Sequence, residues 1–256
     1  KPCPPPPCIP IVNPFLPQFC HECRIPYPCP CKPAPPCVPV FPPKLKGSFK
    51  VKNLVSNVLD LAPTNDANTL NSWGIVLDNS QIVVANNGSG KIGFYTVNGV
   101  PIYSATVPPS SQGVESQGSP TGLVVNLNVS AFNITLGLNS GSARYIVATE
   151  DGSIAGYNSL VSPNSMIEAY AATDGAVYKG LGITNFNLYA ADFHNGKIDT
   201  FNTSFVKQSL VNYPFNDPNI PPGFAPFNVT VINGYVYVVY AKQDVAGAGH
   251  DDIAGP

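Results

Sequence analysis

Thiol chemistry is confined to the start of this chain, because all seven cysteines lie within residues 3–37. Residues 20–23 (CHEC) and 29–31 (CPC) place thiols close together, so they could form disulfides or, with His21, ligate zinc. Zinc ribbons use two C-x-x-C pairs on hairpins, whereas the second pair here is C-x-C, so disulfides are favoured. Because seven is an odd number, one cysteine is left over after the others pair. The expected cross-linking residues are Cys3, Cys8, Cys20, Cys23, Cys29, Cys31 and Cys37.

Carboxylates in the second half of the chain could support a different chemistry. The candidates, each after an apolar run, are Glu150, Asp151, Asp192 and Asp244, with His194 near Asp192. If such oxygens gathered around the axis of a propeller, they could hold calcium and serve a hydrolase of the lactonase or esterase kind. Asp-Gly and Asn-Gly pairs are also what tight hairpins need, and this turn interpretation is favoured. No Gly-X-Ser-X-Gly motif is present. We therefore expect no catalytic residue, no cofactor and no metal.

Asparagine side chains offer sites for modification. Asn-X-Ser/Thr sequons occur at Asn87, Asn128, Asn133, Asn202 and Asn228. Each is a weak signal in a chain rich in these residues, but together with the cysteines they indicate an oxidising compartment. We expect N-linked glycans and an extracellular location, either secreted or on the surface of a cell or virion.

The cysteine-bearing segment is also dense in proline, which removes backbone donors and fixes φ near the polyproline II value. We predict an extended arm over residues 1–43, a linker with a first strand over 44–52, and a β-propeller domain over 53–256.

Composition excludes two classes of partner. Charged residues are only 11% of the chain and the formal net charge is −2, which gives no electrostatic footprint for nucleic acid. No apolar stretch approaches the roughly 20 residues that span a bilayer. We expect no nucleic-acid partner and no membrane span.

From residue 49 onward, short runs rich in Val, Ile, Tyr, Phe and Thr alternate with Asn-Gly, Asp-Gly and Gly-Ser turns, without an amphipathic helix. The fold class is therefore all-β. Similar units at 73–76, 120–123, 178–181 and 226–229 recur at the blade period of a β-propeller, about 40 to 60 residues. The last of the four to five blades is unfinished. Since open sheet edges invite aggregation, we expect further sequence after Pro256 or a second chain to complete the ring.

Long motifs over about residues 53–256 resemble, in order, a family of exported bacterial proteins predicted to be six-bladed propellers. They include NTLNSWGIV, SPTGLVVN, YIVATEDGSIAGYN, LYAADFHNGKIDTFN and DDIAGP. The resemblance implies a six-bladed propeller that is incomplete in this chain, and it implies no catalytic residues. The Cys/Pro-rich arm has no counterpart in the bacterial pattern.

These features predict a structural protein that assembles through its arm. A polyproline II arm advances about 3.1 Å per residue and could reach a neighbouring propeller. Repeated head-to-tail contacts that do not close give a helical homo-oligomeric fibre, which disulfides would make durable. The alternatives are an exported calcium-dependent propeller hydrolase and a carbohydrate- or protein-binding propeller module.

Overall fold

The computed structural model describes residues 49–209, 215 and 217–254. The elements below belong to a compact unit over Val51–Pro256. The predicted arm over 1–43 and its cysteines lie outside the described residues.

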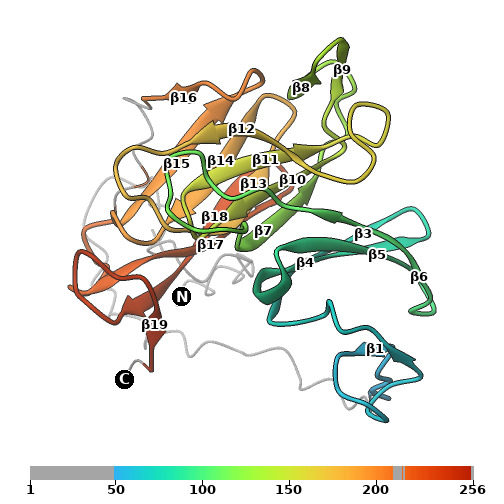
Figure 1. The fold of residues 1–256 in the computed structure, drawn as a ribbon. Coiled ribbons are helices and arrows are strands. Elements are labelled where there is room, and N and C mark those ends of the chain that lie inside the picture. The colour runs from blue at the N-terminus through green and yellow to red at the C-terminus, as the bar shows by residue number, and fades with distance from the viewer. Residues whose placement is uncertain (1–48, 210–214, 216, 255–256) are drawn as a thin grey trace, which may run out of the picture. The chain divides into compact units, whose positions relative to one another are not determined.

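Four antiparallel sheets dominate this compact unit (Figure 1). The first sheet has the order β3 (Ser72–Asp78), β4 (Gln81–Asn86), β5 (Lys91–Thr96) and β6 (Pro101–Thr106). The second has the order β7 (Pro120–Val125), β10 (Tyr145–Thr149), β11 (Ser153–Tyr157) and β12 (Ile167–Ala171). The third has the order β13 (Tyr178–Ile183), β14 (Asn187–Asp192), β15 (Lys197–Asn202) and β16 (Lys207–Gln208). The fourth has the order β17 (Phe224–Ile232), β18 (Tyr235–Gln243) and β19 (Asp252–Ile253).

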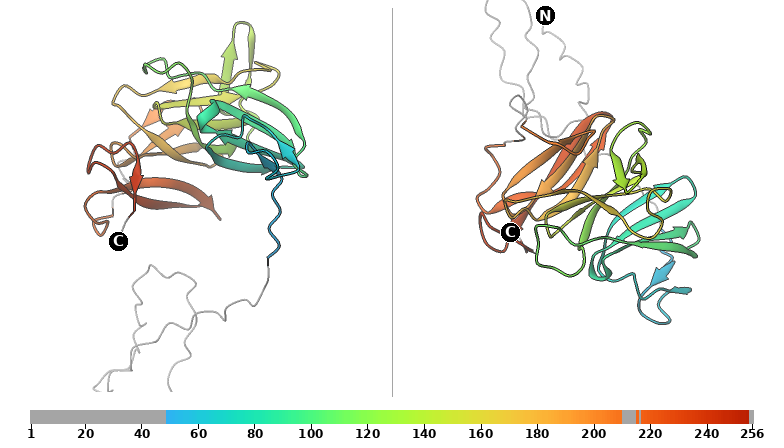
Figure 2. Two further views of the ribbon diagram at one scale, coloured as in Figure 1. Left: turned by 60° about the horizontal axis from the view of Figure 1, so that its bottom comes forward. Right: turned by 45° about the horizontal axis from the view of Figure 1, so that its top comes forward.

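Smaller elements lie between these sheets. They are the parallel pair β1 (Val55–Ser56) and β2 (Thr64–Asn65), the hairpin β8 (Asn133–Leu136) and β9 (Asn139–Ser142), and the 3-10 turn η1 (Asn87–Ser89). The β8–β9 hairpin projects from the second sheet (Figure 2). Within the residues that the structure covers, no helix combines the length and the apolarity needed to cross a membrane.

The four sheets are the blades of a β-propeller, as predicted. The inner strand of each sheet contacts the inner strand of the next: β3 meets β7, β7 meets β13, and β13 meets β17. Strand order within each sheet follows the chain outward from this inner strand, apart from the inserted β8–β9 hairpin. In a propeller, each sheet is one blade, its first strand lies innermost, and neighbouring blades pack face to face. The six-blade count extends beyond these four sheets and stays a prediction.

Buried clusters fill the space between neighbouring blades. Val83 and Phe94 of the first blade pack with Val147 and Tyr157 of the second. A second cluster joins the second and third blades and includes Ile146, Ile154, Tyr178, Leu188 and Phe201. A third joins the third and fourth blades through Tyr189, Ala191 and Val229. Burial of each large apolar side chain stabilises the fold by about 1.5–3 kcal/mol, so the sheets hold one another through these faces.

Glycine allows the inner strands to approach closely. A Cβ added at Gly74 would lie 2.5 Å from a backbone oxygen of β7, and one at Gly122 would lie 2.5 Å from the backbone nitrogen of Leu181. A Cβ at Gly180 would collide with β17. These three glycines occupy the same position in successive repeats, and Asn228 occupies that position in β17. The repeat in the sequence therefore marks where inner strands touch.

The longest hairpin has the turn that its sequence predicts. Asn233 and Gly234 join β17 to β18 with φ values of 51° and 80°. A two-residue turn with positive φ at both positions fits the twist of the flanking strands and favours Asn-Gly.

Candidate binding site at the axial pocket

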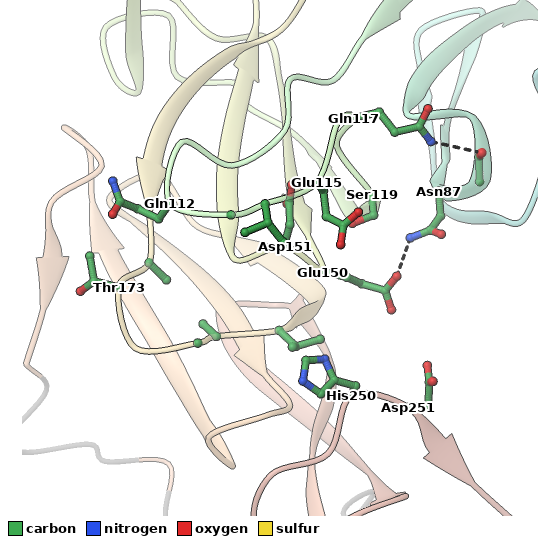
Figure 3. Close-up of a pocket in the computed structure, with 17 residues that line it drawn as sticks. Asn87, Gln112, Glu115, Gln117, Ser119, Glu150, Asp151, Thr173, His250 and Asp251 are labelled. Carbon is green, nitrogen blue, oxygen red and sulfur yellow. Dashed lines mark hydrogen bonds between the residues drawn. The ribbon is translucent and has the colours of Figure 1, made fainter.

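A pocket of about 720 Å³ opens where the inner strands β7 and β13 begin (Figure 3). We call it the axial pocket. Its polar lining residues are Asn87, Gln112, Glu115, Gln117, Ser119, Glu150, Asp151, Thr173, His250 and Asp251. They come from turns within the first, second and fourth blades and from the loops that lead into β7 and β13. The pocket is therefore a product of the propeller and not of one local motif.

A buried ion pair fixes one wall of the axial pocket. The Lys179 ammonium on β13 contacts Oε1 of Glu150, and the two side chains are 1% and 26% exposed. The other Glu150 oxygen, Oε2, accepts a hydrogen bond of 2.8 Å from Nδ2 of Asn87. This chain of contacts joins the third, second and first blades. Both oxygens of Glu150 are engaged, and its charge is balanced by Lys179.

Aromatic rings surround the Lys179 ammonium. Nζ lies 5.1 Å from the ring centroid of Trp73 and 5.8 Å from that of Phe193. The ring centroids of Trp73 and Phe227 are 5.9 Å apart. Trp73, Lys179 and Phe227 each directly precede the close-approach position on β3, β13 and β17, so equivalent positions of three blades meet in one cluster. Contact with π faces offsets part of the cost of burying the ammonium.

Other carboxylates leave the axial pocket acidic. Oδ2 of Asp151 accepts a hydrogen bond of 2.7 Å from the backbone of Ser110. The carboxylates of Glu115 and Glu150 project toward the same space in Figure 3, and Asp251 lies on the opposite rim. No lysine or arginine is found among the lining residues that the structure describes. An anionic ligand would therefore meet repulsion.

Asp244 shapes the loop that borders the axial pocket and does not itself line it. Its Oδ1 accepts hydrogen bonds from the backbone of His250 at 3.0 Å and of Asp251 at 3.2 Å. Desolvation would raise the pKa of Asp244, but backbone donors in this loop outweigh it and hold the pKa below its usual value. The ring of His250 lies 5.2 Å from that of His194, measured between centroids.

Asp192 belongs to a separate cluster in the third blade. Ligand oxygens of Asp174, Asp192 and Asp199 lie within 4.8 Å of one another and could in principle hold a cation. Lysines already compensate them, with Lys197 2.6 Å from Asp174 and Lys207 2.6 Å from Asp199. Burial raises the pKa of Asp192, although hydrogen bonds from Asn195 act in the opposite direction and lower it. The arrangement is that of an ion-pair network in a sheet.

The hydrolase hypothesis requires four carboxylates at the axis, and the structure brings only two of them together. Glu150 and Asp151 line the axial pocket, whereas Asp192 and Asp244 do not. Since Lys179 and Asn87 engage both oxygens of Glu150, the pair is not arranged as a free set of calcium ligands.

The five sequons differ in how accessible they are. Asn133 and Asn228 are exposed, while Asn128 and Asn202 are half-buried. Asn87 is buried, and its Nδ2, the atom that would carry a glycan, donates to Glu150. Attachment at Asn87 would therefore require this contact to break. Glycosylation at all five positions stays a prediction, as do the cysteine cross-links.

Sequence reasoning missed Lys179, His250 and Asp251. A signal for Lys179 was present, because a single lysine interrupts the otherwise apolar inner strand YKGLGI. Charged residues are rarely buried without a partner, so such a lysine predicts an ion pair. The partner could not be predicted, because Glu150 lies 29 residues earlier in the chain. His250 and Asp251 follow the last long strand in a loop without a distinctive motif.

Comparisons with known proteins find viral relatives. The chain is 32% identical over 216 residues to the uncharacterised protein L690 of Acanthamoeba polyphaga mimivirus, covering 79% of this chain and 55% of that protein. It is 30% identical over 222 residues to the uncharacterised protein R648 of the same virus, covering 81% and 54%. The chain thus spans about half the length of these curated relatives. No family model matches it. The resemblance to an exported bacterial family stays a prediction.

Solved structures with a similar arrangement include virginiamycin B lyase from Staphylococcus aureus, with 13% identity and a TM-score of 0.47 over 67% of this chain and 52% of that chain. Another is the β-propeller domain of Cps50 from Myceliophteria thermophila, with 10% identity and a TM-score of 0.39 over 62% and 44%. Strand order and the contacts between inner strands, not these low scores, identify the fold of this chain.

Proposed function

We propose that the propeller is a binding module that takes a polar, hydroxyl-rich ligand such as a carbohydrate in its axial pocket. The observation that carries the proposal is the convergence of side chains from separate blades on one open pocket of about 720 Å³. Amide and hydroxyl groups of Gln112, Gln117, Ser119 and Thr173 supply both donors and acceptors there. Pockets with a few convergent polar groups are the usual places for small ligands.

A substitution at the pocket rim tests this proposal. Gln117 is exposed, lines the axial pocket and donates weakly to the backbone of Gly88 at 3.3 Å. We expect Gln117→Ala to reduce binding of neutral oligosaccharides several-fold while leaving the fold intact. Gln208→Ala is the matched control, because Gln208 is an exposed glutamine on β16 outside the pocket. Equal binding by the two variants would argue against the axial pocket as the site.

We further propose that the chain acts in an extracellular or virion-surface fibre, linked head to tail by the Cys/Pro-rich arm. Two features support this: the arm's composition, with its seven cysteines, and the viral source of the relatives. In such a fibre, the propellers would be the ligand-binding beads. An accessible sequon such as Asn133, in the projecting β8–β9 hairpin, would carry a glycan that limits lateral contacts.

Removal of the arm tests the fibre proposal. The full chain, kept under oxidising conditions, should form filaments in electron micrographs and sediment as an oligomer. A chain beginning at residue 44 should be monomeric at the same concentration. The fibre proposal is wrong if the full chain stays monomeric, or if the truncated chain still forms filaments.

A further inference from the structure

We propose that Lys179 and Asn87 react with each other to form an intramolecular isopeptide bond, with Glu150 as the acid–base group and ammonia as the leaving group. The new bond joins Nζ of Lys179 to Cγ of Asn87. It ties β13, the inner strand of the third blade, to the turn η1 of the first blade. Because the nitrogen that a glycan would need leaves as ammonia, this bond and glycosylation at Asn87 exclude each other. The inference does not depend on ligand binding.

The three groups meet at one carboxylate. Oε1 of Glu150 contacts the Lys179 ammonium, and Oε2 accepts a hydrogen bond of 2.8 Å from Nδ2 of Asn87 (Figure 3). The amine that attacks and the amide that is attacked are therefore held by the two oxygens of the same side chain. Holding two reactants side by side in this way removes much of the entropic cost of their reaction.

Burial makes the Lys179 amine a better nucleophile than the amine of a surface lysine. The Lys179 side chain is 1% exposed, and Nζ lies 5.1 Å from the ring centroid of Trp73 and 5.8 Å from that of Phe193. In such apolar surroundings, transfer of a proton from the ammonium to Glu150 relieves the cost of burying two charges. The transfer leaves a neutral amine, which is the form that can attack a carbonyl carbon.

The side-chain carbonyl of Asn87 is polarised by a second amide. Nδ2 of Asn71 donates a hydrogen bond of 3.1 Å to Oδ1 of Asn87. Asn71 is itself held in place, because its Oδ1 accepts a hydrogen bond of 3.2 Å from Nε1 of Trp73. A donor is therefore aimed at the oxygen on which negative charge develops during the attack. Donors placed in this way stabilise a tetrahedral intermediate.

The atoms and protons of the reaction balance. Glu150 first takes one proton from the Lys179 ammonium. Nζ then forms a bond to Cγ of Asn87, and the π electrons of the carbonyl move to Oδ1. Glu150 gives its proton to Nδ2 and takes a second proton from Nζ, and the bond between Cγ and Nδ2 breaks as the carbonyl forms again. Ammonia leaves, and Glu150 remains as a neutral acid beside the new amide. The three groups together are neutral before and after the reaction.

A competing loss of ammonia is disfavoured by the turn that holds Asn87. In an Asn-Gly pair, the backbone nitrogen of the glycine can attack the asparagine side chain. Here the N–H of Gly88 donates to the carbonyl of Leu70 at 3.0 Å, and Asn87 is buried. The Gly88 nitrogen is engaged in this contact, so Lys179 is the nucleophile that remains available.

A peptide map of the full chain, after reduction of any disulfides, tests the inference directly. Trypsin cuts after lysine and arginine. It should release residues 53–91 and 145–197 as one covalently linked species, lighter by one ammonia than the two peptides together. Cleavage after Lys179 should be absent, because its side chain is then an amide. Mass spectrometry measures both results.

Three variants assign the roles of the residues in the same measurement. Glu150→Gln cannot take the proton of the ammonium, and Lys179→Met has no amine, so neither should give the linked species. Glu168→Gln is the matched control, because Glu168 lies on β12 outside this network. It should give the linked species as the unmodified chain does.

The inference is overturned if the full chain releases residues 53–91 and 145–179 as separate peptides of unchanged mass. It is also overturned if ammonia is lost within residues 53–91 alone, which would show that Gly88 had attacked. A linked species that persists in Glu150→Gln would contradict the role given to the carboxylate. Because the unmodified chain decides the first two outcomes, a variant that fails to fold does not leave the question open.

Discussion

Asp78 is the residue whose contacts most directly connect the first two blades. It ends β3, and its carboxylate accepts hydrogen bonds of 2.7 Å and 2.5 Å from the Arg144 guanidinium and one of 2.9 Å from Tyr145. Its side chain is 9% exposed, so these bonds are made largely out of water. A two-pronged contact between guanidinium and carboxylate adds geometric specificity to charge pairing.

Replacement of Asp78 by asparagine should destabilise the propeller. We expect Asp78→Asn to lower the free energy of unfolding by about 1–3 kcal/mol, because Arg144 and Tyr145 lose a charged acceptor. Urea unfolding at pH 7 measures this loss. Asp252→Asn is the control, since Asp252 is exposed on β19, and it should change stability by less than about 0.5 kcal/mol. Similar losses in both variants would contradict the role given to Asp78.

The same carboxylate predicts a pH dependence. The hydrogen bond from Arg144 holds the pKa of Asp78 below its ordinary value, against the opposing effect of burial. A group whose pKa is lowered by folding stabilises the fold above its unfolded pKa, about 3.9 for Asp. That contribution is lost as the pH falls through the folded pKa. The stability difference between the unmodified chain and Asp78→Asn should therefore be full at pH 7 and shrink below about pH 4. If the Asp78–Arg144 pair did not contribute to stability, urea unfolding would show a difference between the two chains that does not change with pH.

At the scale of elements, the inner strands depend on glycine. Gly122→Ala would place a Cβ 2.5 Å from the backbone nitrogen of Leu181, and backbone on β13 cannot give way as a flexible side chain could. We expect a loss of about 1–3 kcal/mol or more, measured by thermal and urea unfolding. Gly113→Ala is the matched control, because its added Cβ would meet atoms no nearer than 3.4 Å, which is ordinary contact. If Gly122→Ala left the free energy of unfolding unchanged, the inner strands β7 and β13 would be less closely packed than described.

Elements were easier to predict than the contacts between them. The strands and their turns have local signals in the sequence, such as runs of β-forming residues and the Asn233-Gly234 pair. The blades have a periodic signal, which is the repeat that contains Trp73, Lys179 and Phe227. The fold class and the four repeated units followed from these signals. The wall of the axial pocket did not, because Asn87 and Glu150 are 63 residues apart and meet only when two blades stack. Turn carboxylates look alike in sequence, so nothing distinguished Glu150, which reaches the pocket, from Asp192, which does not.

At the scale of the whole molecule, residues Val51–Pro256 form a compact unit with its own internal contacts. We expect a chain beginning at residue 49 to unfold cooperatively, with a midpoint temperature within a few degrees of that of the full chain, since the clusters between blades lie wholly within this unit. Differential scanning calorimetry measures both midpoints. A large drop on truncation would mean that the propeller depends on the preceding residues.

The binding function of the axial pocket is the central claim, and an oligosaccharide array probed with the full chain tests it most directly. The array should carry neutral, sulfated and sialylated glycans. The acidic lining, in which Lys179 balances the charge of Glu150, predicts retention on neutral glycans and weak or no retention on anionic ones. It also predicts a several-fold weaker signal with Gln117→Ala but not with Gln208→Ala. Retention on anionic glycans, or no retention on any glycan, would contradict the account.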